Sequence, residues 1–276
     1  LVHLDADPGV IGRNYRADVA VVGDARLGLA GLLKSIDTAK SDGAFLARAQ
    51  ELRDATRKQI RTEIGPDYEA IMDSMRELLP RDGIVVRDAT VPAYLWGNRL
   101  MPILAPRTSL NPTSAAIGPA LPLAIGAAIG SGKKTAVIQG DGGFMLNIGE
   151  LATAVQYNVP VVTCVFNDGG YGVLRSIEGR TFEGRPFGVE LATPDFAMVA
   201  QGMGMKAERV ESAAGFREAF GRGLAHDGPF PRRPSGHACH LAGRDARCRA
   251  AGRNLRRLAG GGGGRPLGCR ACRAGG

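Results

Sequence analysis

The sequence predicts a doubly wound, mostly parallel α/β sheet with helices on both faces, preceded by part of a second, Rossmann-like domain. The first observation is that short Val- and Ile-rich segments alternate with segments of helical periodicity. The second is the unit at residues 135–171, where a strand, a helix and another strand follow one another closely. A short helical connection places two such strands parallel and next to each other.

The start of the chain predicts the end of a different domain. Residues 1–36 contain two expected strands, at 1–5 and 18–22, and a helix at 25–36, which we interpret as the last part of a middle Rossmann-like domain. The chain has no starting Met and opens directly on a strand, so we expect a fragment of a longer protein.

A polar, charged segment at residues 37–64 marks the expected domain boundary. It predicts a linker followed by an amphipathic helix. The apolar side chains expected on one face of this helix are Phe45, Leu46, Ala49 and Leu52.

Residues 65–230 predict the larger α/β domain. A block of small residues at 109–134 contains an expected helix at 122–129, and Pro122 suits its first position, where a missing N–H costs nothing. The other elements expected outside the 135–171 unit are helices at 68–79, 92–98, 195–202 and 213–224, and strands at 84–86 and 206–210.

The segment at residues 231–276 differs in composition from the rest of the chain. It has 11 Arg, no Lys and one acid, so residues 1–230 keep a net charge of −2 out of the formal +8. It has no Val, Ile, Phe, Tyr or Trp, so we expect a disordered tail that lacks the closing strand of the sheet. Its frequent residues have GC-rich codons, which leads to the hypothesis of a shifted reading frame.

The sequence also excludes some classes of protein. No apolar run is long enough to span a bilayer, and the N-terminus lacks the basic and apolar regions of a secretory signal. Cys164 is the only cysteine before the tail, and its apolar surroundings predict a buried side chain. The absence of a disulfide framework favours a cytoplasmic location.

Two oxygen-bearing side chains follow neighbouring strands of the 135–171 unit. Asp141 lies in Gly140-Asp141-Gly142, and Asn167 ends the next strand after 24 intervening residues. Ligands bind at the carboxyl ends of strands in open α/β sheets. Hard oxygen donors beside glycine suit Mg²⁺ that holds a diphosphate, with the Gly169 carbonyl as a further ligand. We expect a helix beginning near Asn147 to direct its N-terminus there. The alternative is that both motifs are only turns.

At this point the chain resembles the thiamine-diphosphate-dependent decarboxylases and acetolactate synthases. Their diphosphate motif is GDG, roughly two dozen residues and NN, which appears here as Gly140-Asp141-Gly142 and Asn167-Asp168. The flanking segments ELATAVQYNVPVV and NDGGYGVLR are also similar to the benzoylformate decarboxylase and acetolactate synthase versions. The resemblance covers about residues 1–230.

The resemblance implies a cofactor, thiamine diphosphate with Mg²⁺, and a 2-oxo acid substrate. It implies that the chain forms part of a decarboxylase or carboligase that is a homodimer or homotetramer at full length. The residues implied as metal ligands are Asp141, Asn167 and the Gly169 carbonyl. Those implied to line the cofactor are Gly140, Gly142, Gly143 and Tyr171, with Ala115 offering a carbonyl to its amino group and Ile117 forming an apolar wedge beneath it. An ordinary core role for Ile117 is the alternative.

Two departures from the family pattern limit these expectations. Asp168 replaces the second Asn of the motif, so it accepts hydrogen bonds but does not donate them when ionised. The glutamate that activates the cofactor belongs to a pyrimidine-binding domain, and neither Glu150 nor Glu178 matches it, so no catalytic residue is assigned and we expect the chain alone to be inactive.

Two alternatives to the interpretation as part of an enzyme remain. One is a truncated or frameshifted product that catalyses nothing. The other is a nucleic-acid-binding protein that uses the basic tail; without aromatic side chains for base stacking, such binding would be unspecific.

Overall fold

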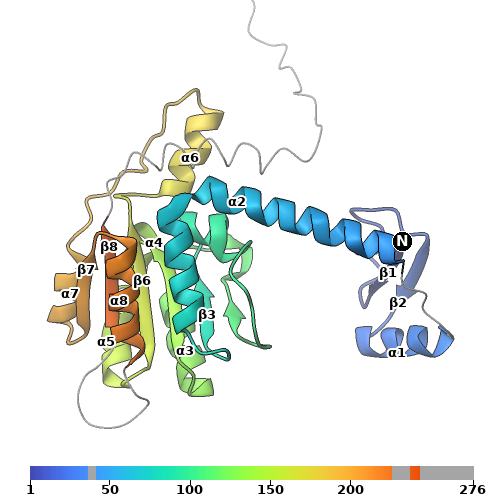
Figure 1. Cartoon of the computed structure of the whole chain (residues 1–276), viewed down its shortest axis with the longest axis horizontal. Helices are drawn as coiled ribbons and strands as arrows, with labels where there is room; N and C mark the ends of the chain where they lie inside the picture. Colours follow the sequence, from blue (N-terminus) through green and yellow to red (C-terminus); the bar gives the residue numbers. More distant parts are fainter. Residues whose placement is uncertain (37–41, 226–236, 243–276) are drawn as a thin grey trace, which may run out of the picture. The chain divides into compact units, whose positions relative to one another are not determined.

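The computed structural model describes residues 1–36, 42–225 and 237–242, the last six by their backbone alone (Figure 1). The chain divides into two compact units, Leu1–Asp54 and the part from Ala55 onward. In the first unit, strands β1 (Val2–Asp5) and β2 (Val19–Val22) pair in parallel, and helix α1 (Ala25–Ser35) follows them. These are the strands and the helix that the sequence predicts for this part of the chain.

Helix α2 (Gly43–Leu78) combines two predicted helices, joined at a kink. Gly65 has a φ of 80°, and the next residue, Pro66, has no backbone N–H to continue the helical hydrogen bonds. The Arg61 side chain crosses this break and pairs with Glu69 and Asp73 at 2.7 and 2.9 Å. These ion pairs therefore connect the helical segments on the two sides of the kink, in addition to the backbone.

The apolar face predicted near the start of α2 is not buried. Phe45, Leu46, Ala49 and Leu52 are all exposed, and Phe45 keeps 73% of its surface. Helical spacing places such side chains on one face, but it does not supply a partner surface.

The sheet of the second unit is entirely parallel among the strands that the structure describes. Its order is β4 (Ser109–Leu110), β3 (Ile84–Arg87), β5 (Thr135–Gly140), β6 (Val161–Asn167), β8 (His237–Ala242) and β7 (Lys206–Val210). The predicted strand–helix–strand unit is confirmed, since β5 and β6 pair directly, Thr135 with Val161 and Gly140 with Phe166.

Strand β8 corrects the expectation that the closing strand is missing and that the whole tail is disordered. It pairs in parallel with β6 on one side and with β7 on the other. Without it, both strands would have unpaired N–H and C=O groups along one edge. Backbone pairing needs no large apolar side chain, which explains why the composition of the tail misled the prediction. Residues 226–236 and 243–276 lie outside the described residues.

Helices cover both faces of this sheet and enclose two hydrophobic cores (Figure 1). On one face the second half of α2, the π-helix η1 (Ala93–Gly97) and α8 (Ala213–Leu224) cover β3, β5 and β6. The other face is covered by α3 (Ala120–Ser131), α4 (Asp141–Leu146), α5 (Glu150–Gln156) and α7 (Phe196–Gly202).

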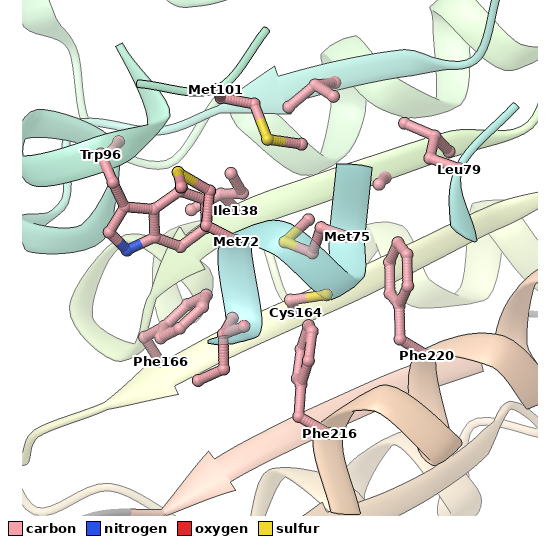
Figure 2. Close-up of a cluster of buried hydrophobic side chains, with 14 of the residues drawn as sticks. Met72, Met75, Leu79, Trp96, Met101, Ile138, Cys164, Phe166, Phe216 and Phe220 are labelled. Carbon is pink, nitrogen blue, oxygen red and sulfur yellow. The ribbon is translucent and has the colours of Figure 1, made fainter. Parts of the chain in front are cut away.

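Alternation along the strands divides the apolar side chains between these cores. Figure 2 shows Ile138 of β5 and Cys164 of β6 in the first core, together with Met72, Trp96 and Phe216. Cys164 is fully buried, as predicted. No helix in the described part of the chain combines the length and the apolar composition of a membrane span.

Two helices begin earlier than the sequence predicts. Helix α3 begins at Ala120, so Pro122 is its third residue and still lies among the first four, whose N–H groups have no partner inside the helix. The helix expected near Asn147 is replaced by the six-residue α4, which begins at Asp141 itself, and by α5 after a break. Gly140 is extended immediately before Asp141, so the motif leads directly into a helix.

Candidate functional site

Three polar residues lie at the carboxyl edge of the sheet. Asp88 directly follows β3, Asp141 directly follows β5, and Asn167 is the last residue of β6. The pairing register brings these strand ends together, because Arg87 lies opposite Ile138 and Gly140 lies opposite Phe166. This is the edge at which parallel α/β sheets bind ligands.

The Asp141 carboxylate is buried and surrounded by backbone donors. It is 1% exposed, and it accepts hydrogen bonds from the N–H groups of Gly142, Gly169 and Gly170 at 2.8, 2.8 and 2.9 Å. Burial raises the pKa of Asp141, and the three N–H groups and the charge of Arg175 oppose that rise. A negative charge held in this way is suited to meet a cation.

Asn167 shares a donor with Asp141. Its side-chain oxygen accepts the Gly169 N–H at 3.1 Å and the hydroxyl of Thr193 at 3.3 Å. One amide oxygen and one carboxylate oxygen therefore converge on the same N–H. In the described part of the chain no three His, Cys, Asp or Glu side chains are placed to hold a metal ion. A cation here would depend on mixed carboxylate, amide and carbonyl oxygens, and this chemistry fits Mg²⁺.

Gly169 is placed differently from the other predicted residues. Its N–H is directed at Asp141, but its carbonyl accepts the N–H of Leu191 at 2.9 Å. Arg175 also approaches this carbonyl oxygen, at 3.4 Å. Gly169 therefore lies at the site, but its carbonyl oxygen accepts hydrogen bonds from Leu191 and Arg175 in this structure.

The glycines of the motif stand where a side chain would collide with neighbouring groups. A Cβ atom on Gly142 would lie 2.5 Å from a ring carbon of Tyr171, and a Cβ on Gly143 would lie 2.6 Å from the Asp88 carboxylate. These distances are shorter than packed atoms allow, so the close approach of the backbone depends on glycine.

A cavity of about 970 Å³ opens at this edge of the sheet. Every predicted site residue except Gly169 lines it, with Ala115 and Ile117 on a wall that comes from the small-residue block. Ser114 and Ala115 have φ values of 56° and 54°, in the left-handed region that residues with a Cβ seldom adopt. Such strained backbone concentrates at binding sites.

Aromatic and acidic side chains that the sequence analysis did not select also line the cavity. Tyr68 and Phe166 lie there with ring centroids 6.1 Å apart. Two glutamates border it, but both have partners: Glu63 accepts a hydrogen bond from Gln59, and Glu211 pairs with Arg209.

Asp168, which departs from the expected Asn, has a basic partner. Its carboxylate lies 3.4 Å from the Arg175 guanidinium, and Arg175 also pairs with Glu190 at 2.7 Å. The extra negative charge is therefore partly compensated by a side chain of helix α6 (Gly172–Thr181), which follows Asp168 in the chain.

Asp88 is the acidic residue that the sequence analysis missed. It is 4% exposed, it lines the cavity, and burial raises its pKa against the hydrogen bonds from Gly118, Ala89 and Gln139. The rule that selected Asp141 and Asn167, a polar residue at the carboxyl end of a predicted strand, also applies to Asp88.

The comparisons with known proteins agree with this geometry. Residues 92–230 match the family model described as thiamine pyrophosphate enzyme, C-terminal TPP binding domain. The chain is 28% identical to a probable acetolactate synthase large subunit of Methanococcus aeolicus, over 83% of this chain and 42% of that protein. It is 30% identical to a benzoylformate decarboxylase of Pseudomonas aeruginosa, with the same two coverages.

A solved structure extends the likeness to the fold. The Rhodococcus jostii RHA1 thiamine diphosphate-dependent 4-hydroxybenzoylformate decarboxylase is 26% identical, with a TM-score of 0.64 over 88% of this chain and 43% of that chain. The chain thus spans about two fifths of the length of the curated relatives it matches. The chain belongs to the thiamine pyrophosphate enzymes, and residues 92–230 are its C-terminal TPP-binding domain.

Proposed function

We propose that this chain binds thiamine diphosphate through Mg²⁺ at the carboxyl ends of β5 and β6, as part of a 2-oxo acid decarboxylase or acetolactate-synthase-like carboligase. The observation that carries the proposal is the convergence of Asp141 and Asn167 oxygens on the Gly169 N–H at the edge of the cavity. Both relatives named above act, by their names, in acetolactate synthesis or in benzoylformate decarboxylation.

The metal ligands in this proposal are Asp141, Asn167 and the Gly169 carbonyl. The first two offer a charged and a neutral oxygen from neighbouring strand ends. The Gly169 carbonyl accepts the Leu191 N–H at 2.9 Å and the Arg175 guanidinium at 3.4 Å, so a cation would take the place of the longer Arg175 contact. A bound cation would offset the buried charge of Asp141.

The remaining residues would hold the organic cofactor. The glycines at 140, 142 and 143 let the backbone approach the diphosphate. At the other end, the Ala115 carbonyl would accept a hydrogen bond from the cofactor's amino group, and Ile117 would support the two rings. Ile117 lines the cavity and keeps 37% of its surface exposed, so it offers an apolar contact that the protein core does not use.

When bound, thiamine diphosphate supplies a carbon nucleophile for the 2-oxo acid carbonyl and an electron sink as carbon dioxide leaves. The contribution of this chain is to bind and orient that group. No catalytic acid is assigned to it: Glu63 and Glu211, the glutamates of the cavity, are both engaged elsewhere. We therefore propose that the activating glutamate comes from a separate pyrimidine-binding domain, and that this chain alone turns over neither pyruvate nor benzoylformate.

Calorimetric titration of the chain with thiamine diphosphate, with and without Mg²⁺, tests the cofactor proposal. We expect binding that requires Mg²⁺ and that Asp141→Asn weakens at least about tenfold, because the amide removes the charge that faces the cation. Asp82→Asn is the matched control, since Asp82 lies just before β3, at the opposite end of the strand from Asp88, and its carboxylate contacts Lys133 at 3.6 Å.

Asn167→Ala provides a second variant if Asp141→Asn unfolds. Equal affinity in the wild type and in both site variants would contradict the metal assignment, and wild-type binding without Mg²⁺ would remove the metal from the proposal. Turnover of pyruvate or benzoylformate by the isolated chain would overturn the proposed dependence on another domain. A homodimeric or homotetrameric full-length enzyme and a cytoplasmic location remain predictions from the sequence.

A further inference from the structure

Asp88 is a buried carboxylate that the proposed cofactor contacts leave without a role. One of its oxygens accepts the N–H groups of Ala89 at 2.8 Å and Gly118 at 3.0 Å. The other accepts the Gly118 N–H at 2.9 Å and the Gln139 side-chain amide at 2.8 Å. The carboxylate thus joins the end of β3 to β5 and to the segment that contains Ile117.

Gln139 completes a clamp on Gly118. Its amide nitrogen donates to the Gly118 carbonyl at 3.1 Å as well as to Asp88. Gly118 is therefore held at its N–H by Asp88 and at its carbonyl by Gln139. Both side chains are buried, Gln139 completely.

The orientation of the Gln139 amide follows from Asp88. Its oxygen is buried with no hydrogen-bond partner among the described residues. Turning the amide over would face that oxygen toward the carboxylate and lose both donated bonds, which costs more than one unmade hydrogen bond.

Close backbone packing fixes the same segment from the other side. Gly118 has a φ of 100°, and a Cβ on it would lie 2.9 Å from the Asn147 amide and 3.3 Å from the Gly143 carbonyl. A Cβ on Gly143 would lie 2.6 Å from the Asp88 carboxylate and 3.3 Å from the Gly118 nitrogen. Gly143, the last glycine of the motif, is therefore required by Asp88 and Gly118 even without a ligand.

We propose that Asp88 and Gln139 are positioning residues that clamp the Gly118 peptide groups and thereby hold Ile117 against the cavity. The proposal rests on the function proposed above, in which Ile117 supports the rings of the cofactor. Ile117 precedes Gly118, so the peptide that Asp88 fixes is the one that joins them. Neither Asp88 nor Gln139 needs to touch the diphosphate for this role.

The proposal predicts weaker binding of the rings of the cofactor and unchanged binding of its diphosphate. Asp88→Asn keeps the shape of the side chain, but its amide group faces the donors of Gln139, Ala89 or Gly118. We expect this variant to bind thiamine diphosphate about tenfold more weakly in Mg²⁺ and to bind inorganic pyrophosphate in Mg²⁺ as the wild type does. Ile117→Ala should give the same pattern, because it removes the wedge directly.

Asp195→Asn is the matched control. Asp195 also accepts two backbone N–H groups, those of Ala197 and Met198, but it caps helix α7 and does not line the cavity. Its substitution should leave the affinity for both ligands unchanged. Thermal unfolding of each variant separates a loss of fold from a loss of position.

Hydrogen exchange at the Gly118 amide, measured by NMR without ligand, tests the clamp itself. We expect exchange about tenfold faster in Asp88→Asn than in the wild type. If Asp88→Asn does not fold, Gln139→Leu replaces it, because it removes only the two bonds that the Gln139 amide donates.

The outcomes separate this inference from the proposed function. Equal weakening of thiamine diphosphate and pyrophosphate, or no weakening of either, overturns the positioning role while the metal site stands. Unchanged Gly118 exchange in the variant overturns the clamp. A wild-type chain that binds neither ligand contradicts the proposed function, and the exchange measurement still decides whether Asp88 holds Gly118.

Discussion

Asp141 and Asn167 accept hydrogen bonds from the same backbone N–H, that of Gly169, at 2.8 and 3.1 Å. The two residues come from the ends of adjacent parallel strands, and the pairing of Gly140 with Phe166 sets their alignment. A shift of one residue in this register would direct one side chain to the opposite face of the sheet. The site therefore depends on strand pairing as much as on the motif.

Gly142→Ala should destabilise the protein by about 1–3 kcal/mol, because the added methyl would lie 2.5 Å from the Tyr171 ring. Urea unfolding measures the difference. Gly149→Ala is the control: nothing lies within 4 Å of its added Cβ, and its φ of −59° suits alanine. Equal stability of the two variants would contradict the predicted crowding at Tyr171.

The Asp168–Arg175 pair should show measurable coupling in a double-mutant cycle. The two side chains are 22% and 25% exposed, so we expect about 0.5–1 kcal/mol from Asp168→Asn, Arg175→Gln and the double variant. A parallel cycle with Glu190→Gln should give less, since the Glu190 side chain is 73% exposed. A larger coupling energy for Arg175 with Glu190 than with Asp168 would show that solvent exposure does not determine these coupling energies.

The pKa of Asp88, raised by burial above its ordinary value of 3.8, should appear in the pH dependence of stability. In the pH interval just above 3.8 the folded protein holds a proton that the unfolded chain has released. The contribution of Asp88 to the free energy of unfolding therefore falls as the pH rises through that interval, by at most about 1.4 kcal/mol per pH unit.

Asp88→Asn has no proton to release at this position. Chemical denaturation between pH 4 and pH 7 measures the free energy of unfolding of both proteins. This free energy should fall more steeply with rising pH in the wild type than in Asp88→Asn. Parallel curves for the two proteins would show that the Asp88 pKa is not raised by folding.

Strand β8 should contribute strongly to stability. A chain that ends at residue 236 lacks the partner of both β6 and β7, whereas one that ends at residue 242 keeps it. We expect the shorter chain to be less stable by several kcal/mol, at about 1 kcal/mol for each ladder hydrogen bond lost. Denaturant unfolding compares the two, and equal midpoints would mean that β8 adds nothing to the sheet.

Much of the fold follows from local patterns. Buried parallel strands are continuous apolar runs, so β5 and β6 can be recognised directly, and helix α8 begins and ends at the predicted residues 213 and 224. The helix start at Asp141 could not be predicted in this way, because glycines at 142 and 143 usually indicate a turn. In the structure these two glycines lie against Tyr171 and Asp88, which are distant in the sequence and leave no room for a Cβ.

The sequence predicted the residues of the motif in the candidate site. It did not predict the residues that hold the backbone around them. Asp141 and Asn167 stand in a recognisable spacing, whereas Asp88 and Gln139 meet only after β3 and β5 pair in register. Their role is to hold backbone, so no motif spacing marks them. For the same reason the engaged carbonyl of Gly169 could not be predicted from its sequence neighbours.

The position of β8 between β6 and β7 also sets an order of events in the folding of the domain. Both neighbours are synthesised earlier than the strand that joins them, so β7 has no place in the sheet until residue 242 has left the ribosome. Until then, the paired strands β3, β5 and β6 expose one open edge, to which another chain could add. Completion of this sheet therefore waits for β8, and a chaperone that shields the edge of β6 until then would raise the yield of folded protein.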